Sequence, residues 1–220
     1  MIEEIDFFES LKNRVKEPFF LQVGAMDGVY DDPLYEIIEK YHWPGLLIEP
    51  LPDIFEKLKQ NYRGHNNLIY ENVAITDHVE ECIMYRITED QIQQNKLPEW
   101  LSGCSTLQTS MYQKNPYHSH FIETKVKCSP LKNILNKHQI TKIDIVISDT
   151  EGFDYIVFKQ LDFSIFNPYL ILIEVEHLNE NDQDKMFKKL NQLGYNTNTW
   201  ELYGNKSILA VKELNNTCLK

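Results

Sequence analysis

The amino-acid sequence predicts an α/β protein of the doubly wound type, a mostly parallel sheet with helices on both faces. Short apolar runs recur along the chain and amphipathic helical stripes separate them, a pattern typical of strands buried on both faces. The first run, residues 19–23, ends in a glycine turn at 24–28. A buried strand that stops in such a turn is typical of α/β proteins that bind nucleotide-like ligands, although a plain strand-to-helix turn stays open.

The first half of the chain contains three successive strand units. An N-terminal helix is predicted within residues 1–17, ahead of the first strand. The later elements alternate, with helices at 34–41 and 54–62 and strands at 45–49 and 67–75. Crossovers between parallel strands are nearly always right-handed, so the first strand should lie centrally, with the second and third stepping outward from it.

The second half continues the alternation and ends in an antiparallel pair. Further strands are predicted at 81–86, 121–128, 142–148 and 169–175, with helices at 130–138 and 181–193 and one after the acidic turn 149–154. The final strands, 195–202 and 206–212, are joined through Gly204 and Asn205 and should pair antiparallel. We expect a single domain over residues 1–220.

Residues 88–120 interrupt the pattern. This segment is polar and shows little periodicity, and loops of such length tend to be functional lids or disordered. We interpret it as an insertion that covers an acceptor site, with Trp100, Ser105 and Thr106 as candidate substrate contacts. A plain surface insertion stays open as the alternative. We interpret His118 and His120 as parts of a polar loop rather than metal ligands.

Charge and composition exclude several classes of partner. The 220 residues contain 22 Lys and Arg against 33 Asp and Glu, a formal charge of −11, which repels nucleic acid and anionic membrane surfaces. No secretory signal or membrane-spanning run is visible, so we expect a soluble, cytoplasmic protein of unspecified oligomeric state. The four cysteines lie far apart without a CxxC pair and are expected to be thiols rather than a zinc site or disulfides.

Ligands of open α/β sheets bind beyond the carboxyl ends of the strands, so strand-end residues are the site candidates. Glu49 ends the second strand and follows the glycine turn by about 20 to 25 residues, where an acid can accept hydrogen bonds from both ribose hydroxyls. NAD and S-adenosylmethionine both fit this arrangement. The turn lacks GxGxxG, and Asp27 would repel a pyrophosphate, which favours S-adenosylmethionine.

The chain resembles the FkbM-type methyltransferases, within the class I S-adenosylmethionine-dependent fold. The resemblance rests on FLQVGAMDG (20–28), LLIEP (46–50), NVAITD (72–77), GCSTL (103–107), IDIVISDTEGFD (143–154) and LILIEVEH (170–177). It implies a Rossmann-like, mostly parallel seven-stranded sheet with a C-terminal antiparallel strand pair. It also implies S-adenosylmethionine as cofactor, held at its methionine, ribose and adenine parts by Gly24, Ala25, Asp27, Gly28, Glu49, Val73 and Ala74.

One position departs from the common class I pattern. Gln22 stands two residues before the first glycine, where class I methyltransferases often have an acid. A glutamine can hydrogen-bond the amino-acid end of the cofactor but offers no charge to its ammonium group. Gln22 is therefore retained as a cofactor-binding candidate.

The acidic turn at 149–154, directly after the predicted strand 142–148, is the candidate catalytic centre. Methyl transfer to oxygen requires an aligned acceptor and a group that manages the hydroxyl proton. Asp149 is the first candidate for that base or orienter, at a position that also touches the cofactor, followed by Glu151 and His177. We expect Glu174 to face a neighbouring strand or helix.

Two further questions stay open. Asp149, Glu151 and Glu176 could hold a divalent cation, but we favour a site without a metal. The resemblance implies O-methylation of a sugar, a glycan or a secondary metabolite; an NAD-linked oxidoreductase and a non-catalytic Rossmann-like binding domain are the alternatives.

Overall fold

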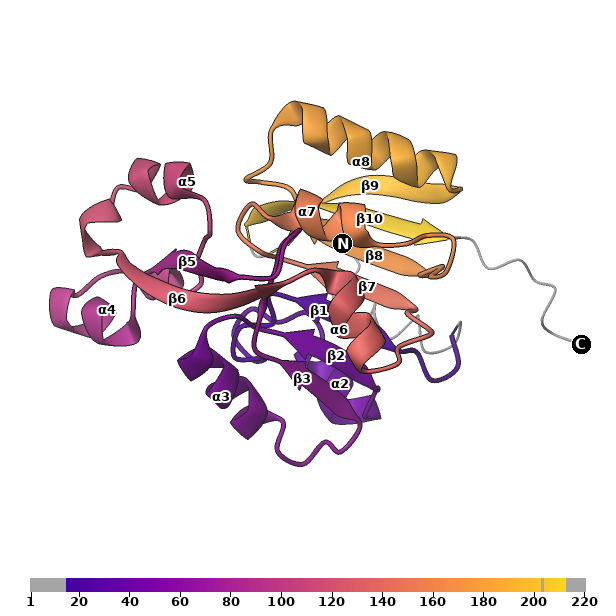
Figure 1. Cartoon of the computed structure of the whole chain (residues 1–220), viewed down its shortest axis with the longest axis horizontal. Helices are drawn as coiled ribbons and strands as arrows, with labels where there is room; N and C mark the ends of the chain where they lie inside the picture. Colours follow the sequence, from indigo (N-terminus) through magenta and orange to yellow (C-terminus); the bar gives the residue numbers. More distant parts are fainter. Residues whose placement is uncertain (1–14, 203, 213–220) are drawn as a thin grey trace, which may run out of the picture.

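The computed structural model of the protein describes residues 15–202 and 204–212 (Figure 1). The helix predicted within residues 1–17 lies outside these residues, apart from its last three positions. Cys218 also lies outside them. Among the described helices, none has the length and apolar character needed to cross a membrane.

Seven strands form the main sheet, in the order β3-β2-β1-β7-β8-β10-β9. They are β1 Phe20–Val23, β2 Gly45–Ile48, β3 Leu68–Glu71, β7 Ile145–Ser148, β8 Leu170–Glu174, β9 Tyr195–Leu202 and β10 Asn205–Lys212. The first five in this order pair in parallel, and β10 pairs antiparallel with both β8 and β9. The predicted sheet, with β1 central and a final antiparallel pair, is confirmed.

Helices cover both faces of this sheet, as predicted (Figure 1). They are α2 Tyr35–Tyr41, α3 Pro52–Asn61, α6 Leu131–Lys137, α7 Asp154–Gln160 and α8 Glu180–Gln192. Successive strand residues point to opposite faces. Phe20 accordingly packs in one apolar cluster with residues of α2 and α3, whereas Leu21 packs in another with residues of α6, α7 and α8.

The prediction of one continuous strand over residues 67–75 is wrong. The first part of this range is β3, but its last two residues form β4, Ala74–Ile75, in a separate sheet of order β4-β6-β5. The break falls at Asn72, whose side-chain amide donates to the carbonyl oxygens of Glu49 (2.8 Å) and Pro50 (3.0 Å). These bonds hold Asn72 beside the end of β2, and the chain after β3 leaves the main sheet at this point.

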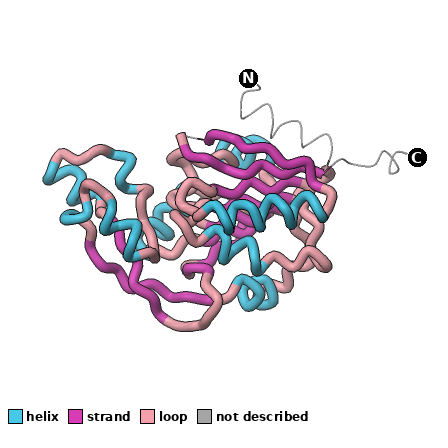
Figure 2. The backbone as a smooth tube through the Cα atoms, turned by 90° about the horizontal axis from the view of Figure 1, so that it is seen from above, coloured by secondary structure: helices cyan, strands magenta, loops and turns pink. Residues whose placement is uncertain are grey.

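The small sheet carries the segment predicted to be irregular. Its other strands are β5 Glu81–Arg86 and β6 Ile122–Ser129. Between them the chain forms α4 Glu89–Asn95, η1 Glu99–Ser102, α5 Thr109–Lys114 and η2 His118–His120, so the expectation of an irregular segment is wrong. Thr88 and Gln91 form a capping box that starts α4. Figures 1 and 2 show this group projecting to one side of the main sheet.

The expectation of free thiols is wrong for two cysteines. Cys82 on β5 and Cys128 on β6 form a disulfide, with their Cα atoms 6.3 Å apart. They lie 46 residues apart in sequence and meet because β5 and β6 pair antiparallel. Cys104 is a free thiol.

Candidate active site

A cavity of about 880 Å³ lies at the carboxyl ends of the central strands. Residues at the ends of β1, β2, β7 and β8 line it, together with several residues between 100 and 121 from the segment between β5 and β6. Its volume is within the range of small-molecule and cofactor sites. The cavity therefore has the place predicted for a ligand in an open α/β sheet.

The glycine turn after β1 forms part of the wall. Gly24 has φ +80°, and a Cβ atom there would lie 1.7 Å from the carbonyl oxygen of Asp149. Gly24 and Ala25 line the cavity, whereas Asp27 and Gly28 are not among the lining residues. The Asp27 carboxylate instead accepts hydrogen bonds from the amides of the two residues after Gly28, at 3.0 and 2.9 Å.

Gln22 presents a buried acceptor to the cavity. Its side-chain amide nitrogen donates to Asp32 Oδ2 at 3.0 Å. Its Oε1 atom is buried and accepts no hydrogen bond from the described residues. A buried carbonyl oxygen without a donor is costly, so this atom is suited to a ligand that brings an N–H group.

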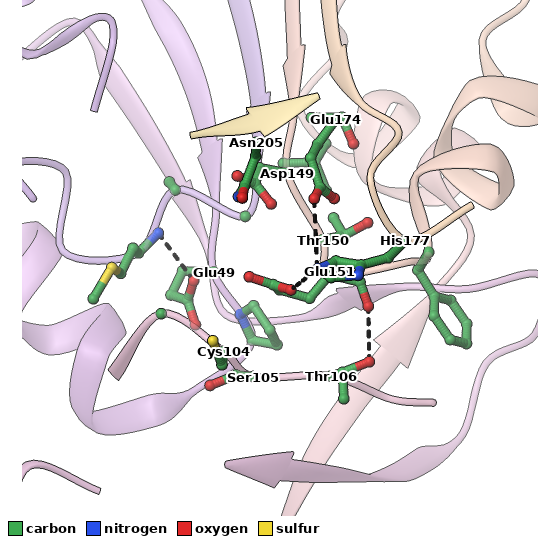
Figure 3. A pocket seen from close by; sticks show the side chains of 18 of the residues that line it. Glu49, Cys104, Ser105, Thr106, Asp149, Thr150, Glu151, Glu174, His177 and Asn205 are labelled. Atoms are coloured by element: carbon green, nitrogen blue, oxygen red, sulfur yellow. Dashed lines mark hydrogen bonds and ion pairs between the residues drawn. The ribbon is translucent and has the colours of Figure 1, made fainter. Parts of the chain in front are cut away.

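Glu49 lies at the end of β2 with both carboxylate oxygens engaged. Oε2 accepts from the amide of Met26 at 3.1 Å, the bond drawn to Glu49 in Figure 3, and Oε1 accepts from the amide of Leu51 at 2.8 Å. Burial raises the pKa of Glu49 to about 7, although these two bonds act to lower it. Each oxygen keeps acceptor capacity for a ligand hydroxyl. Val73 and Ala74 line the same cavity.

Asp154 shapes the acidic turn after β7. It belongs to the sequence motif at 143–154, but the sequence pattern assigned it no role. This fully buried carboxylate accepts from Ser148 Oγ at 2.6 Å and from the amide of Thr150 at 3.1 Å. Glu151 adopts φ +51°, a conformation rarely taken by non-glycine residues. Its carbonyl oxygen accepts from Thr106 Oγ1 at 2.8 Å. The signal in the sequence was an acid placed to close a short turn before a helix.

Four carboxylates gather beside this turn. Asp149, Glu151, Glu174 and Glu176 all line the cavity (Figure 3 labels the first three). Burial, followed by the charges of Glu151 and Asp154, raises the pKa of Asp149 to about 8. Lys114 is the only lysine or arginine among the described lining residues.

Glu174 corrects the sequence prediction, because its carboxylate faces the cavity. The residue is 3% exposed, and neither oxygen accepts a hydrogen bond from a described residue. Burial, followed by the charge of Asp149, raises the pKa of Glu174 to about 11. The sequence signal was a carboxylate at the end of an otherwise apolar strand, with no basic residue beside it.

His177 joins two of these acids. Its Nε2 atom lies 3.0 Å from Glu151 Oε2 and 3.7 Å from Glu174 Oε1, the latter too long for a hydrogen bond. The hydrogen bond to Glu151 raises the pKa of His177, although partial burial acts against it. Three side chains from the turn and from the end of β8 thus converge at one place.

The predicted substrate contacts also line the cavity. Trp100, Ser105 and Thr106 are among its lining residues, and the Trp100 side chain is half exposed. His118 and His120 are not among them. The structure therefore brings together the predicted candidates at the strand ends and in residues 100–106. Asp27 and Gly28 belong to the glycine turn but do not line the cavity.

The sheet order and the cavity at its strand ends define a class I methyltransferase fold. The sequence profile of the methyltransferase FkbM domain matches residues 22–197. The chain belongs to this methyltransferase family, which favours methyl transfer over the NAD-linked alternative.

Solved structures resemble the chain at low sequence identity. The METTL16 MTase domain is 12% identical, with a TM-score of 0.51, and the match covers 96% of this chain and 66% of that one. The O-methyltransferase from Bacillus cereus in complex with SAH is 11% identical, with a TM-score of 0.48 and coverage of 94% and 79%. Aeropyrum pernix fibrillarin with natively bound S-adenosyl-L-methionine is 12% identical, with a TM-score of 0.44 and coverage of 89% and 66%. No curated protein matches the chain significantly.

Proposed function

We propose that the protein transfers a methyl group from S-adenosylmethionine to a hydroxyl group of a sugar, a glycan or a secondary metabolite. The observation that carries the proposal is one cavity lined by the turn at Gly24, by buried Glu49 and by Asp149, whose pKa is raised to about 8. Membership of the FkbM methyltransferase family supports the reaction class.

The residues on the β1 and β2 side fit this cofactor. The unpartnered Oε1 atom of Gln22 can accept from the ammonium group, and the turn at Gly24 lets a ligand approach the backbone. Glu49 is fixed by two backbone amides and can accept from the ribose hydroxyls. Val73 and Ala74 provide an apolar wall for the adenine. When bound, S-adenosylmethionine supplies an electrophilic methyl group on a sulfonium.

The residues on the β7 and β8 side fit the acceptor. Asp149 has a pKa near the pH at which such enzymes work, which suits a group that accepts the hydroxyl proton. The ion pair of Glu151 and His177 can orient the acceptor. The half-exposed ring of Trp100 offers an apolar surface to a sugar ring, and Ser105 and Thr106 offer hydroxyl groups beside it.

Calorimetric titration with S-adenosylhomocysteine tests the cofactor assignment. We expect one binding site per chain. The acceptor class is then tested by incubating the protein with S-adenosylmethionine and a panel of glycosides and polyols, with mass spectrometry to detect gain of one methyl group. Absence of binding by either form of the cofactor would overturn the proposal and favour a non-catalytic binding domain.

A further inference from the structure

Glu151, Glu174 and His177 form a compact group of potential ligand atoms. One carboxylate oxygen from each acid and one imidazole nitrogen all lie within 4.8 Å of one another. The His177 nitrogen is 3.0 Å from the nearest Glu151 oxygen and 3.7 Å from the nearest Glu174 oxygen. This group differs from the trio weighed in the sequence, Asp149, Glu151 and Glu176, for which a site without a metal was favoured.

Glu174 supplies an independent sign that a ligand belongs there. Its carboxylate is almost fully buried, faces the cavity (Figure 3) and has no hydrogen-bond donor among the described residues. A buried carboxylate is retained in proteins when it is paired or coordinates a metal. Its described charged neighbour is His177, whose Nε2 atom lies 3.7 Å away, and no described salt bridge joins it to a lysine or arginine. A cation bound between the two side chains would complete the pairing.

The separations between the three atoms suit a metal ion. Divalent ions such as Zn²⁺ and Mg²⁺ bind nitrogen and oxygen ligands at about 2.0 to 2.2 Å, which places adjacent ligand atoms roughly 3 Å apart. The separations from the His177 nitrogen, 3.0 and 3.7 Å, are close to that value, and all three atoms lie within 4.8 Å of one another.

The surrounding contacts hold Glu151 in place, and the partly exposed His177 keeps the site accessible. Glu151 belongs to the turn held by Asp154, and its backbone carbonyl is held by Thr106. The His177 side chain is 34% exposed, which leaves a route from the cavity and open positions for water or acceptor oxygens. Glu176 is set apart because its carboxylate accepts from the amide of Lys206 at 3.4 Å.

We propose that Glu151, Glu174 and His177 bind a divalent cation, with Mn²⁺ as the preferred probe. Two carboxylates suit hard ions such as Mg²⁺ and Mn²⁺, and the imidazole shifts the preference toward transition metals. The proposal deepens the proposed function, because the cation would hold oxygens of the acceptor. The role of the cation in holding the acceptor rests on the proposed function, whereas the binding of the cation itself does not.

Electron paramagnetic resonance of Mn²⁺ tests the site in the whole chain without cofactor. We expect saturable binding of one ion per chain in the wild type, with a nitrogen coupling from His177 in electron spin echo modulation. Glu174→Gln and His177→Gln should each weaken binding about tenfold or more, with loss of the nitrogen coupling in His177→Gln. Glu176→Gln is the matched control and should bind within about twofold of the wild type.

Two outcomes would overturn the proposal: no saturable Mn²⁺ binding by the wild type, or a loss in Glu176→Gln equal to that in Glu174→Gln. His177→Gln keeps the test valid if Glu174→Gln does not fold, because His177 is partly exposed. S-adenosylhomocysteine is titrated separately into the same proteins. Failure of that titration alone overturns the cofactor assignment, and failure of the Mn²⁺ titration alone overturns the cation site.

Discussion

The cavity has two halves, and a carboxylate at the end of a buried parallel strand marks each. Glu49 directly follows β2 and is 5% exposed. Glu174 is the last residue of β8 and is 3% exposed. The oxygens of Glu49 accept two backbone amides, whereas those of Glu174 accept none. The pKa of Glu49 is raised to about 7 and that of Glu174 to about 11. Hydrogen bonds to the charged form offset the cost of burial only on the β2 side.

The backbone after each strand explains the difference. After β2 the chain turns into α3, and the free amide of Leu51 at the start of that helix points to Glu49. After β8 the amide of Val175 donates to the carbonyl of Lys206 on antiparallel β10 instead. Backbone amides therefore satisfy Glu49 on the cofactor half, whereas Glu174 on the acceptor half has no hydrogen-bond donor among the described residues.

Asp149→Asn should produce the largest effect, because it removes the proposed proton acceptor from the acceptor half. We expect the rate of methyl transfer to fall about 10² to 10⁴-fold, while affinity for S-adenosylhomocysteine changes by about twofold or less. Single-turnover kinetics and calorimetry measure the two quantities. Asp184→Asn on exposed α8 is the control. An unchanged rate would remove Asp149 from its assigned role.

Gly24→Ala should destabilise the close contact between the glycine turn after β1 and the acidic turn after β7, where the two halves of the cavity meet. The added Cβ would lie 1.7 Å from the Asp149 carbonyl oxygen, at a backbone φ of +80°. We expect a loss of at least about 3 kcal/mol in the free energy of unfolding, measured by urea denaturation. Gly64→Ala is the matched control, because no atom lies within 4 Å of its added Cβ, and should change stability by about 0.5 kcal/mol or less. Equal stability of the two variants would contradict the close packing at this turn.

Glu49→Ala should act on the cofactor half alone. Loss of the ribose acceptor should weaken S-adenosylhomocysteine binding about tenfold or more, equivalent to roughly 1.4 kcal/mol. The variant should bind Mn²⁺ as the wild type does. Glu56→Ala on the exposed face of α3 is the control for calorimetry. Unchanged affinity in Glu49→Ala would rule out the ribose assignment.

The last prediction concerns the pH dependence of stability without divalent cation. The folded-state pKa of Glu174 is raised above the value of an unfolded glutamate, so the folded chain holds a proton that the unfolded chain releases. Stability should therefore fall as pH rises from about 5 to 8, and Glu174→Gln should flatten this slope. Urea denaturation in chelator at the two pH values measures it. Identical slopes in wild type and variant would show that Glu174 titrates normally.

The sequence predicted the central place of β1, with β2 and β3 stepping outward, because these strands are locally apolar and crossovers between parallel strands are nearly always right-handed. It predicted the antiparallel pair of β9 and β10 from the turn at Gly204 and Asn205. It also predicted Glu49 and Asp149, because strand-end positions can be read from the pattern. Two features depend on contacts between distant segments and were missed: the exit of the chain at Asn72 and the disulfide between Cys82 and Cys128. The helices within residues 88–120 were also missed, although the capping box of Thr88 and Gln91 is a local signal for the first of them.

Glu174 was missed for a related reason. Its position in the strand was visible, but the lack of a donor follows from the pairing of Val175 with Lys206, about 30 residues later in the chain. The alternative trio of Asp149, Glu151 and Glu176 did not include it, because sequence spacing does not show which carboxylates already accept hydrogen bonds. Glu176 is engaged by the amide of Lys206, and Glu174 is not.

A crossed calorimetric titration tests the division of the cavity most directly. S-adenosylhomocysteine and Mn²⁺ are each titrated into the wild type, Glu49→Ala and Glu174→Gln. The division predicts that Glu49→Ala loses affinity only for S-adenosylhomocysteine and that Glu174→Gln loses affinity only for Mn²⁺. If either variant lost both ligands while retaining its fold, or if neither lost its own ligand, the assignment of the two halves would be contradicted.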